Sequence, residues 1–149
     1  MPELPEVETV RRGLAHLLTG YTFRSAQDLH PRVLKPASIA PLTTVIDARI
    51  TTINRRGKFL WFELDRDFVL VAHLGMSGQL LVQEEKSLPQ PHLRAKFGLS
   101  GNRKSNQDQI RFIDQRTFGW LSVEQTVNGI PVSVREIAYD PFEKDFNLK

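Results

Sequence analysis

The first residues of the chain carry groups suited to covalent chemistry. Proline follows the initiator methionine, and Glu3 follows Pro2. Removal of Met1 would expose the secondary amine of Pro2, a nucleophile that is partly unprotonated at neutral pH. Attack of such an amine on a sugar C1′ or an aldehyde gives an iminium, and the neighbouring carboxylate of Glu3 can transfer protons. Taken alone, the pattern favours a plain helix start in which proline and glutamate act as capping residues.

Two turns that contain glycine present further candidates. Gly57 closes a predicted hairpin, and Lys58 opens the next strand on the same face as Leu60. A lysine at the rim of an apolar face can bind phosphate or act as an acid, although most such lysines are only solvated. The segment HLGMSG predicts a tight turn that projects Met76, which can wedge between nucleic-acid bases or fold into the core. His73 can contact a phosphate or satisfy the turn.

Two basic segments suggest contacts with nucleic acid. Arg116 and Phe118 lie two residues apart, so an extended chain would place them on one side, where arginine can bind a base edge and phenylalanine can stack. The alternative is an ordinary strand with an arginine on its wet face. His92 follows a proline, and Arg94 and Lys96 alternate behind it, which favours a basic strand edge suited to phosphates.

These side chains require a scaffold, and its elements can be predicted from periodicity. A helix should begin at Pro5 and end near Gly20, because apolar residues repeat between them at helical spacing. Short strands rich in β-branched and aromatic residues follow, at 21–28, 43–54, 58–64, 68–74, 78–83, 93–100, 109–115 and 118–123. We expect mobile loops at 84–92 and 101–107, and a second helical pattern after Gly129 that Asp140–Pro141–Phe142 interrupts. The pattern predicts a mainly β protein with flanking helices (α+β), an eight-stranded antiparallel β-sandwich with an N-terminal helix.

Composition narrows the class of protein. The 149 residues contain no cysteine, which excludes disulfides, a thiolate nucleophile and a cysteine-ligated metal site within this chain. No apolar run approaches the roughly 20 residues that cross a bilayer. The net charge is +3, but residues 9–135 hold 18 Lys and Arg against 10 Asp and Glu, a surplus of eight. A basic body of this kind favours a polyanionic partner, nucleic acid first.

Together the motifs resemble the formamidopyrimidine-DNA glycosylase and endonuclease VIII family of bifunctional repair enzymes. PELPEVETVRRGL opens the chain, and RRGK, HLGMSG and R-x-F-G follow in the family's order. The likeness runs from Met1 to about Val123. Four modest signals in one order outweigh the separate structural interpretations given above.

The resemblance implies three catalytic residues. Pro2 corresponds to the N-terminal proline that attacks C1′ of the damaged nucleotide. Glu3 corresponds to the adjacent carboxylate that handles protons at the sugar ring. Lys58 corresponds to the hairpin lysine that contacts phosphate and lesion and assists strand cleavage.

It also implies five contacts with DNA. Met76, Arg116 and Phe118 correspond to the trio that fills the gap left by the everted base, with Arg116 facing the orphaned cytosine and Phe118 wedging the stack. His73 and His92 correspond to phosphate contacts. The family's usual D-P-R-R-F-G is D-Q-R-T-F-G here, a departure that bears on the shape of this turn more than on the roles of Arg116 and Phe118.

The activity that the resemblance implies is base excision DNA repair. A DNA glycosylase and AP lyase of this kind excises oxidised purines, 8-oxoguanine and formamidopyrimidines, through a Schiff base on its N-terminal proline and then cleaves the strand by β/δ-elimination. The alternatives are an endonuclease VIII-type enzyme for oxidised pyrimidines, against which PELPEVE and the trio argue, and a catalytically silent DNA-binding module. We expect this chain to be the N-terminal portion and inactive alone.

The resemblance further implies the organisation of the protein. Residues 1–130 would form the catalytic N-terminal β-sandwich domain, and residues 131–149 would start a truncated helix-two-turn-helix domain. No cofactor and no metal are expected in this chain, and the family's structural zinc would lie in a missing C-terminal part. The expected partner is double-stranded DNA with oxidised bases or abasic sites. The protein should be a cytoplasmic, nucleoid-associated monomer of bacterial type, without membrane contact.

Overall fold

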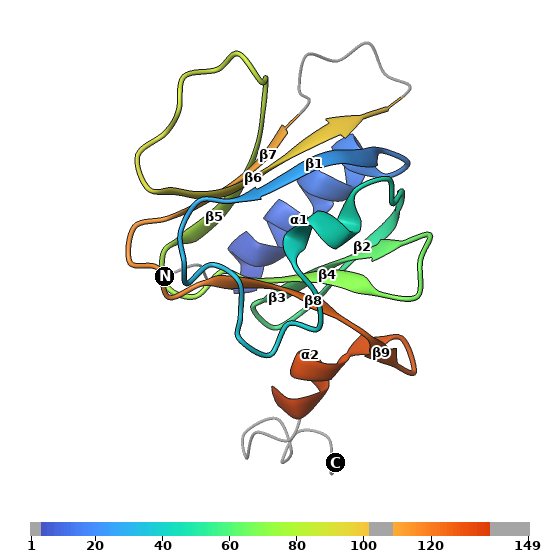
Figure 1. The fold of residues 1–149 in the computed structure, drawn as a ribbon. Coiled ribbons are helices and arrows are strands. Elements are labelled where there is room, and N and C mark those ends of the chain that lie inside the picture. The colour runs from blue at the N-terminus through green and yellow to red at the C-terminus, as the bar shows by residue number, and fades with distance from the viewer. Residues whose placement is uncertain (1–3, 102–108, 138–149) are drawn as a thin grey trace.

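Backbone hydrogen bonds pair the strands into two antiparallel sheets (Figure 1). The computed structural model describes residues 4–101 and 109–137. The first sheet has the order β1-β6-β7-β5 and the second the order β2-β3-β4-β8. The strands are β1 (Thr22–Asp28), β2 (Ile50–Arg56), β3 (Phe59–Leu64), β4 (Val69–His73), β5 (Gly78–Gln83), β6 (Leu93–Ser100), β7 (Gln109–Asp114) and β8 (Trp120–Glu124).

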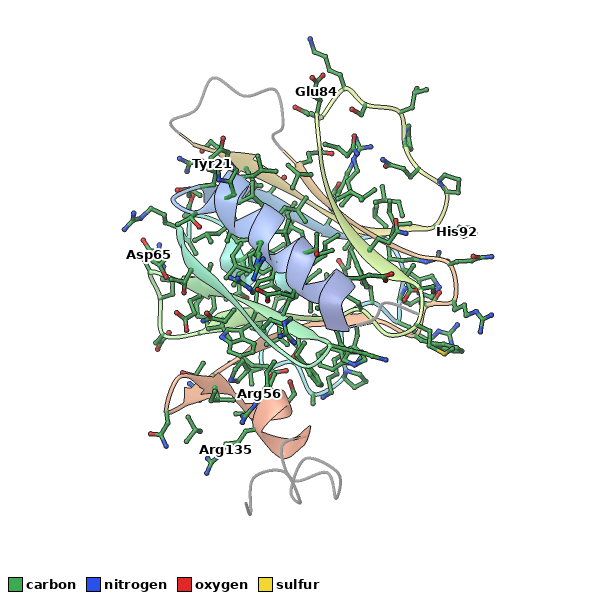
Figure 2. The ribbon with its side chains drawn as sticks, turned by 180° about the vertical axis from the view of Figure 1, so that it is seen from behind. Tyr21, Arg56, Asp65, Glu84, His92 and Arg135 are labelled. Carbon is green, nitrogen blue, oxygen red and sulfur yellow. The ribbon has the colours of Figure 1, made fainter. Side chains whose placement is uncertain are left out.

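The core fills the space between these two sheets. The ring of Phe23 in β1 meets that of Phe62 in β3 across this space, edge to face at 6.2 Å. It also packs edge to face, at 5.5 Å, on the ring of Phe97 in β6, the neighbouring strand of its own sheet. Helix α1 (Leu4–Leu18) adds buried Val7, Leu14 and Leu18 to the same core. Figures 1 and 2 show α1 running along the opening between the sheets. The predicted eight-stranded antiparallel β-sandwich with an N-terminal helix is therefore confirmed.

Three short elements complete the described chain. They are the 3₁₀ helix η1 (Leu42–Val45), a two-stranded ribbon of β9 (Thr126–Val127) and β10 (Ile130–Pro131), and helix α2 (Val132–Ile137). Val134 of α2 is fully buried against the outer face of the second sheet, where it contacts a cluster that includes Trp61 and Val71. The predicted second helical segment is thus present, whereas the proposed break at 140–142 lies outside the described residues.

Three predicted strands were wrong in detail. The strand expected at 43–54 is divided: residues 42–45 form η1, Asp47 adopts a left-handed φ of 75°, and β2 begins only at Ile50. The last two strands were expected to run through 109–115 and 118–123, but residues 115–119 form a bend in which Thr117 has a φ of 59°. The predicted loop at 84–92 has no regular secondary structure, and most of the loop at 101–107 is outside the described residues.

Candidate nucleic-acid interface

An open cleft of about 800 Å³ lies where the first turn of α1 meets β5 and the turn before β5. Glu6, Val7 and Val10 line it from α1, and Met76 and His92 line it from the opposite side. Pro2 and Glu3, the two predicted catalytic residues that precede α1 in sequence, lie outside the described residues. The cleft therefore opens beside the helix that follows the predicted nucleophile.

The turn at 74–78 and the bend at 115–119 pack backbone against backbone. Gly75 has a φ of 60°, and a Cβ added there would lie 2.9 Å from the nitrogen of Gly119 and 3.0 Å from the carbonyl carbon of Phe118. Only glycine allows this approach. Met76 and Phe118 extend from the paired loops with exposed fractions of 43% and 59%. The structure thus brings together two predicted wedge residues that are 42 positions apart in sequence.

Asp114, at the end of β7, ties these loops to each other. Its side chain is fully buried. One carboxylate oxygen accepts a hydrogen bond from the Ser77 hydroxyl at 2.5 Å and another from the Arg116 backbone N–H at 3.2 Å. The other oxygen accepts the Gly119 N–H at 2.6 Å. A single carboxylate therefore sets the distance between the Met76 turn and the Arg116–Phe118 bend.

An extended chain, the arrangement considered in the sequence analysis, is not what carries Arg116 and Phe118. Both residues lie in the bend at 115–119. The positive φ of Thr117 between them turns the chain, and both side chains are exposed. The backbone of Arg116 is nevertheless fixed, because its N–H also lies 3.3 Å from the Ser77 hydroxyl. Hydrogen bonds through Asp114 and Ser77 therefore join the two loops that carry Met76, Arg116 and Phe118. The three residues are brought together by these bonds and not by the alternation of side chains along a strand.

Lys58 lies at the turn of the β2–β3 hairpin, where Gly57 has a φ of 59°. The arm of this hairpin is bonded to α1. The guanidinium of Arg55 donates to Glu8 at 3.0 Å and to the Gly57 carbonyl at 3.0 Å. Glu8 is in the second turn of α1, so the predicted catalytic lysine is fixed relative to the helix that follows Pro2.

Glu8 is the centre of a cluster of charged side chains. Arg11 donates two hydrogen bonds of 2.9 Å to its two carboxylate oxygens and a third, of 3.1 Å, to the carbonyl of Ile53 in β2. Arg12 adds one at 3.0 Å. The hydrogen bonds from Arg11 and then Arg55 hold the pKa of Glu8 well below its ordinary value of 4.5, and Glu8 in turn raises the pKa of Arg11.

His73 ends β4 within an aromatic stack. Its ring lies nearly parallel to that of Trp120 at 5.5 Å and also contacts Phe59 at 4.7 Å. Its Nδ1 accepts the Gly75 N–H at 3.1 Å, so the neutral ring carries its proton on Nε2. Burial lowers the pKa of His73 from its ordinary 6.5, and the nearby charges of Lys58 and Lys35 lower it further.

Lys35 extends the stack on which His73 lies. Its Nζ is 4.4 Å from the centre of the Trp120 ring, a cation–π contact. Lys58 directly precedes Phe59, the cross-strand partner of His73, and Lys35 and His73 both contact the Trp120 ring, so three groups able to contact phosphate lie near one another. Sequence reasoning singled out His73 and Lys58 but missed Lys35, because nothing in the local pattern marks the lysine that pairs with Trp120.

His92 is exposed and precedes β6 with a φ of 64°. His92 therefore does not belong to the basic strand edge that the sequence predicts for His92, Arg94 and Lys96, because β6 begins only at Leu93. The guanidinium of Arg94 instead donates to the carbonyl of Asp114 at 2.9 Å. His92 shares the cleft with Met76, whereas Arg94 supports the end of β7.

Several functional candidates escaped sequence reasoning. Asp114 and Glu8 join segments that are distant in sequence, and Glu6 lines the cleft from the first turn of α1. The one available signal for Asp114 was its place at the start of D-Q-R-T-F-G, two residues before Arg116. Among the described residues, no group of three or more His, Asp or Glu side chains is placed to hold a metal ion, and no helix is long and apolar enough to cross a membrane.

Comparison with known proteins identifies the family. Residues 1–121 match the family model described as the formamidopyrimidine-DNA glycosylase N-terminal domain. The chain belongs to the formamidopyrimidine-DNA glycosylase family. It is 43% identical to the formamidopyrimidine-DNA glycosylase of Corynebacterium jeikeium over 164 aligned positions, which cover 100% of this chain and 55% of that protein. It is 45% identical to that of Acidothermus cellulolyticus, covering 99% and 51%.

Solved structures of formamidopyrimidine-DNA glycosylases share the fold. The Lactococcus lactis enzyme in complex with DNA containing an abasic site superposes with a TM-score of 0.73 at 31% identity, over 83% of this chain and 44% of that one. MutM in complex with DNA containing carbocyclic 8-oxo-G superposes with a TM-score of 0.71 at 31% identity, over 84% and 45%. The chain spans about half the length of the curated family members that it matches.

Proposed function

We propose that this chain is the nucleophile-bearing part of a bifunctional DNA glycosylase that removes oxidised purines and then cleaves the abasic strand. The observation that carries the proposal is the pair of exposed apolar side chains, Met76 and Phe118, on two loops locked together at Asp114 beside the cleft. Exposed apolar side chains on rigid turns suit insertion between bases. Family members bound to damaged DNA support the same partner here.

In this proposal the damaged nucleotide leaves the duplex before chemistry. A glycosidic bond inside a base stack is out of reach, so the enzyme everts the nucleotide and fills the gap. Phe118 wedges the stack, Met76 occupies the vacated space and Arg116 faces the base left unpaired. The hydrogen bonds from Ser77 and the backbone to Asp114 hold these groups in place beforehand, so that less order is lost on binding.

The proposed chemistry begins at the amine of Pro2 once Met1 is removed. The nitrogen lone pair forms a bond to C1′ while the glycosidic bond breaks, and the purine leaves with that electron pair and takes up a proton. Glu3 handles the proton that opens the sugar ring and gives the iminium. The iminium acidifies the adjacent C–H bonds, so loss of one proton expels the 3′ phosphate, and loss of a second proton then expels the 5′ phosphate. Lys58 and His73 hold phosphate groups during these steps.

No cofactor takes part in this scheme. The structural zinc of the family is expected in sequence beyond these 149 residues, and this chain by itself is expected to be inactive. Since bacterial DNA lies in the cytoplasm, the function would place the parent protein there as a monomer acting on duplex DNA.

The test uses the full-length parent with two duplexes, one carrying 8-oxoguanine opposite cytosine and one carrying an oxidised pyrimidine. We expect excision and strand cleavage mainly on the first, and borohydride should trap a covalent protein–DNA adduct. Pro2→Gly should impair trapping far more than Lys58→Ala. Preferential cleavage of the oxidised pyrimidine would assign the protein to the endonuclease VIII type, and undiminished trapping by Pro2→Gly would identify another amine as the nucleophile.

A further inference from the structure

Arg111 is a buried cation whose role the proposed chemistry does not use. It lies in the middle of β7 and is only 4% exposed. Its neighbours Ile110 and Phe112 face the core between the sheets, so alternation places Arg111 on the outer face of its sheet. There the segment 84–90, which connects β5 to β6, covers the guanidinium.

The guanidinium bonds to this segment with both of its terminal nitrogens. Nη1 donates to the Leu88 carbonyl and to the Gln90 side-chain oxygen, each at 2.9 Å. Nη2 donates to the carbonyls of Ser87 at 3.0 Å, Glu84 at 3.2 Å and Glu85 at 3.4 Å. Nε donates to the side chain of Gln109 in its own strand at 3.0 Å. All these acceptors are neutral oxygens.

The buried guanidinium contributes more to the conformation of the segment 84–90 than to the free energy of unfolding. Burying a guanidinium costs free energy that hydrogen bonds offset only when all its donors are used, and an apolar side chain would fill the position more cheaply. The planar fork of arginine, however, can fix several carbonyls in one arrangement. The segment 84–90 has no regular secondary structure, so Arg111 supplies the order that backbone pairing would supply elsewhere.

The segment held by Arg111 leads directly into His92. Gln90 is bonded to the guanidinium, and Pro91 has a restricted φ. The carbonyl of His92 accepts the Asp114 N–H at 3.1 Å, so the chain is held on both sides of the histidine. Figure 2 shows Glu84 and His92 at opposite ends of the loop, with His92 toward the side where it lines the cleft.

We propose that Arg111 is a positioning residue that fixes the exposed His92 side chain at the rim of the cleft, where it contacts a DNA phosphate. The inference rests on the proposed function, because it takes the ligand to be the sugar-phosphate backbone. A preset histidine loses less conformational freedom on binding than one on an unrestrained loop. Arg111 acts through His92 and does not itself touch DNA.

The test is a double-mutant cycle on the 149-residue chain. Binding to a fluorescent duplex with an abasic-site analogue is measured by anisotropy at low salt for the wild type, Arg111→Lys, His92→Ala and the double variant. Lysine keeps the charge but has one nitrogen and cannot hold the segment. We expect Arg111→Lys and His92→Ala to weaken binding by a similar factor, about tenfold for one charge-assisted hydrogen bond, and the double variant to bind no more weakly than either.

Two further measurements separate positioning from general loss of fold. Amide hydrogen exchange in Arg111→Lys should accelerate across residues 84–92 and stay unchanged in β2 and β3. The matched control is Arg24→Lys, the same chemical change at an exposed arginine of the same sheet, which should bind within twofold of the wild type. If Arg111→Lys does not fold, Gln90→Leu is used in its place, because it removes one acceptor of the Arg111 guanidinium from the loop. Gln90→Leu should weaken DNA binding by a smaller factor, and it should cause no further loss of affinity when His92 is already alanine.

The outcomes are distinct. If the double variant binds more weakly than either single variant, by the product of their two effects, the inference is overturned while the proposed function stands. The same holds if Arg111→Lys binds with wild-type affinity while His92→Ala binds weakly. An unchanged affinity in His92→Ala would also overturn it. Absence of DNA binding by the wild-type chain would instead remove the proposed function and this inference together.

Discussion

At the scale of single residues, the carboxylate of Asp114 joins the two loops that carry Met76 and Phe118. Its carboxylate receives three donors, two of them backbone N–H groups, and offers only acceptors in return. Replacement by asparagine keeps the size but turns an amide NH₂ toward at least one of these donors. The loops that carry Met76 and Phe118 then lose their common anchor.

We expect Asp114→Asn to lower the free energy of unfolding by about 1–3 kcal/mol, because buried donors are left unpaired. Urea denaturation followed by tryptophan fluorescence measures the change. Asp67→Asn, at an exposed position in the β3–β4 turn, is the matched control and should differ from the wild type by less than about 0.5 kcal/mol. Equal stabilities of the two variants would show that Asp114 does not anchor the loops.

His73 makes stability depend on pH near neutrality. Its pKa is below 6.5 in the folded state, so the unfolded chain binds more protons as pH falls through 6.5. Stability that is present above pH 6.5 is consequently lost between 6.5 and the lower folded pKa. We expect the unfolding free energy to drop from pH 7 to 5.5 in the wild type and to drop less in His73→Phe. His16→Asn, at an exposed position of α1, should retain the wild-type slope, and an unaltered slope in His73→Phe would contradict the assignment.

At the scale of elements, close contact between the two loops depends on glycine. A Cβ on Gly119 would lie 2.7 Å from the His73 carbonyl oxygen, 2.9 Å from the Phe112 ring and 3.0 Å from the Asp114 carboxylate. We expect Gly119→Ala to destabilise the fold by about 1–3 kcal/mol through overpacking. Gly13→Ala is the internal control, because no atom lies within 4 Å of a Cβ there and alanine is the better helix former, worth up to about 1 kcal/mol. The melting temperature should therefore fall for Gly119→Ala and rise for Gly13→Ala. A Gly119→Ala variant that is as stable as the wild type would show that the loops can separate.

The packing of α1 against the β2–β3 hairpin depends on Glu8. Its carboxylate has a strongly lowered pKa, so its contribution is complete above 4.5 and is lost as pH falls below that value. The difference in melting temperature between the wild type and Glu8→Gln should therefore be constant from pH 7 to about 5.5 and shrink in more acidic buffers. Glu84→Gln, which alters an exposed side chain, serves as the control. A Glu8 difference that does not depend on pH would mean that the ionised carboxylate is not what joins the two elements.

At the scale of the whole molecule, the excess of basic residues should govern binding of this chain to DNA. Residues 9–135 carry 18 Lys and Arg against 10 Asp and Glu. The chain spans about half the length of the curated relatives that it matches, so we expect most of its contacts to be to phosphate, and these release counterions. We expect affinity for duplex DNA to fall by about one to two orders of magnitude between roughly 50 and 200 mM NaCl, with little difference between damaged and intact duplexes. Tight binding to damaged DNA that is insensitive to salt would show that this half alone recognises the lesion.

The family, the two-sheet architecture and most of the strands could be predicted from the order of residues along the chain. Runs of β-branched and aromatic residues between turn signals mark β3 to β7 within one or two residues. β3 and β4 are apolar over most of their length because both of their faces are buried, one against the core and one against the cluster that includes Val134. The motifs around Lys58 and Met76 also marked turns that the structure contains. These features follow from local patterns of residue type, which a single chain displays directly.

The assembly of the candidate site could not be predicted in this way, because it depends on contacts between distant segments. The bend at Thr117, the division of the segment 43–54 and the contact of Gly75 with Gly119 are imposed by packing between distant segments, which overrides the local tendency to extend. Asp114 bonds to Ser77 across 37 residues, and Arg111 to Leu88 across 23. An aspartate or arginine in a strand sequence has the same local appearance whether it faces water or a buried loop. Its partners depend on strand register and on the path of the connecting chain, and these exist only after the sheets have packed.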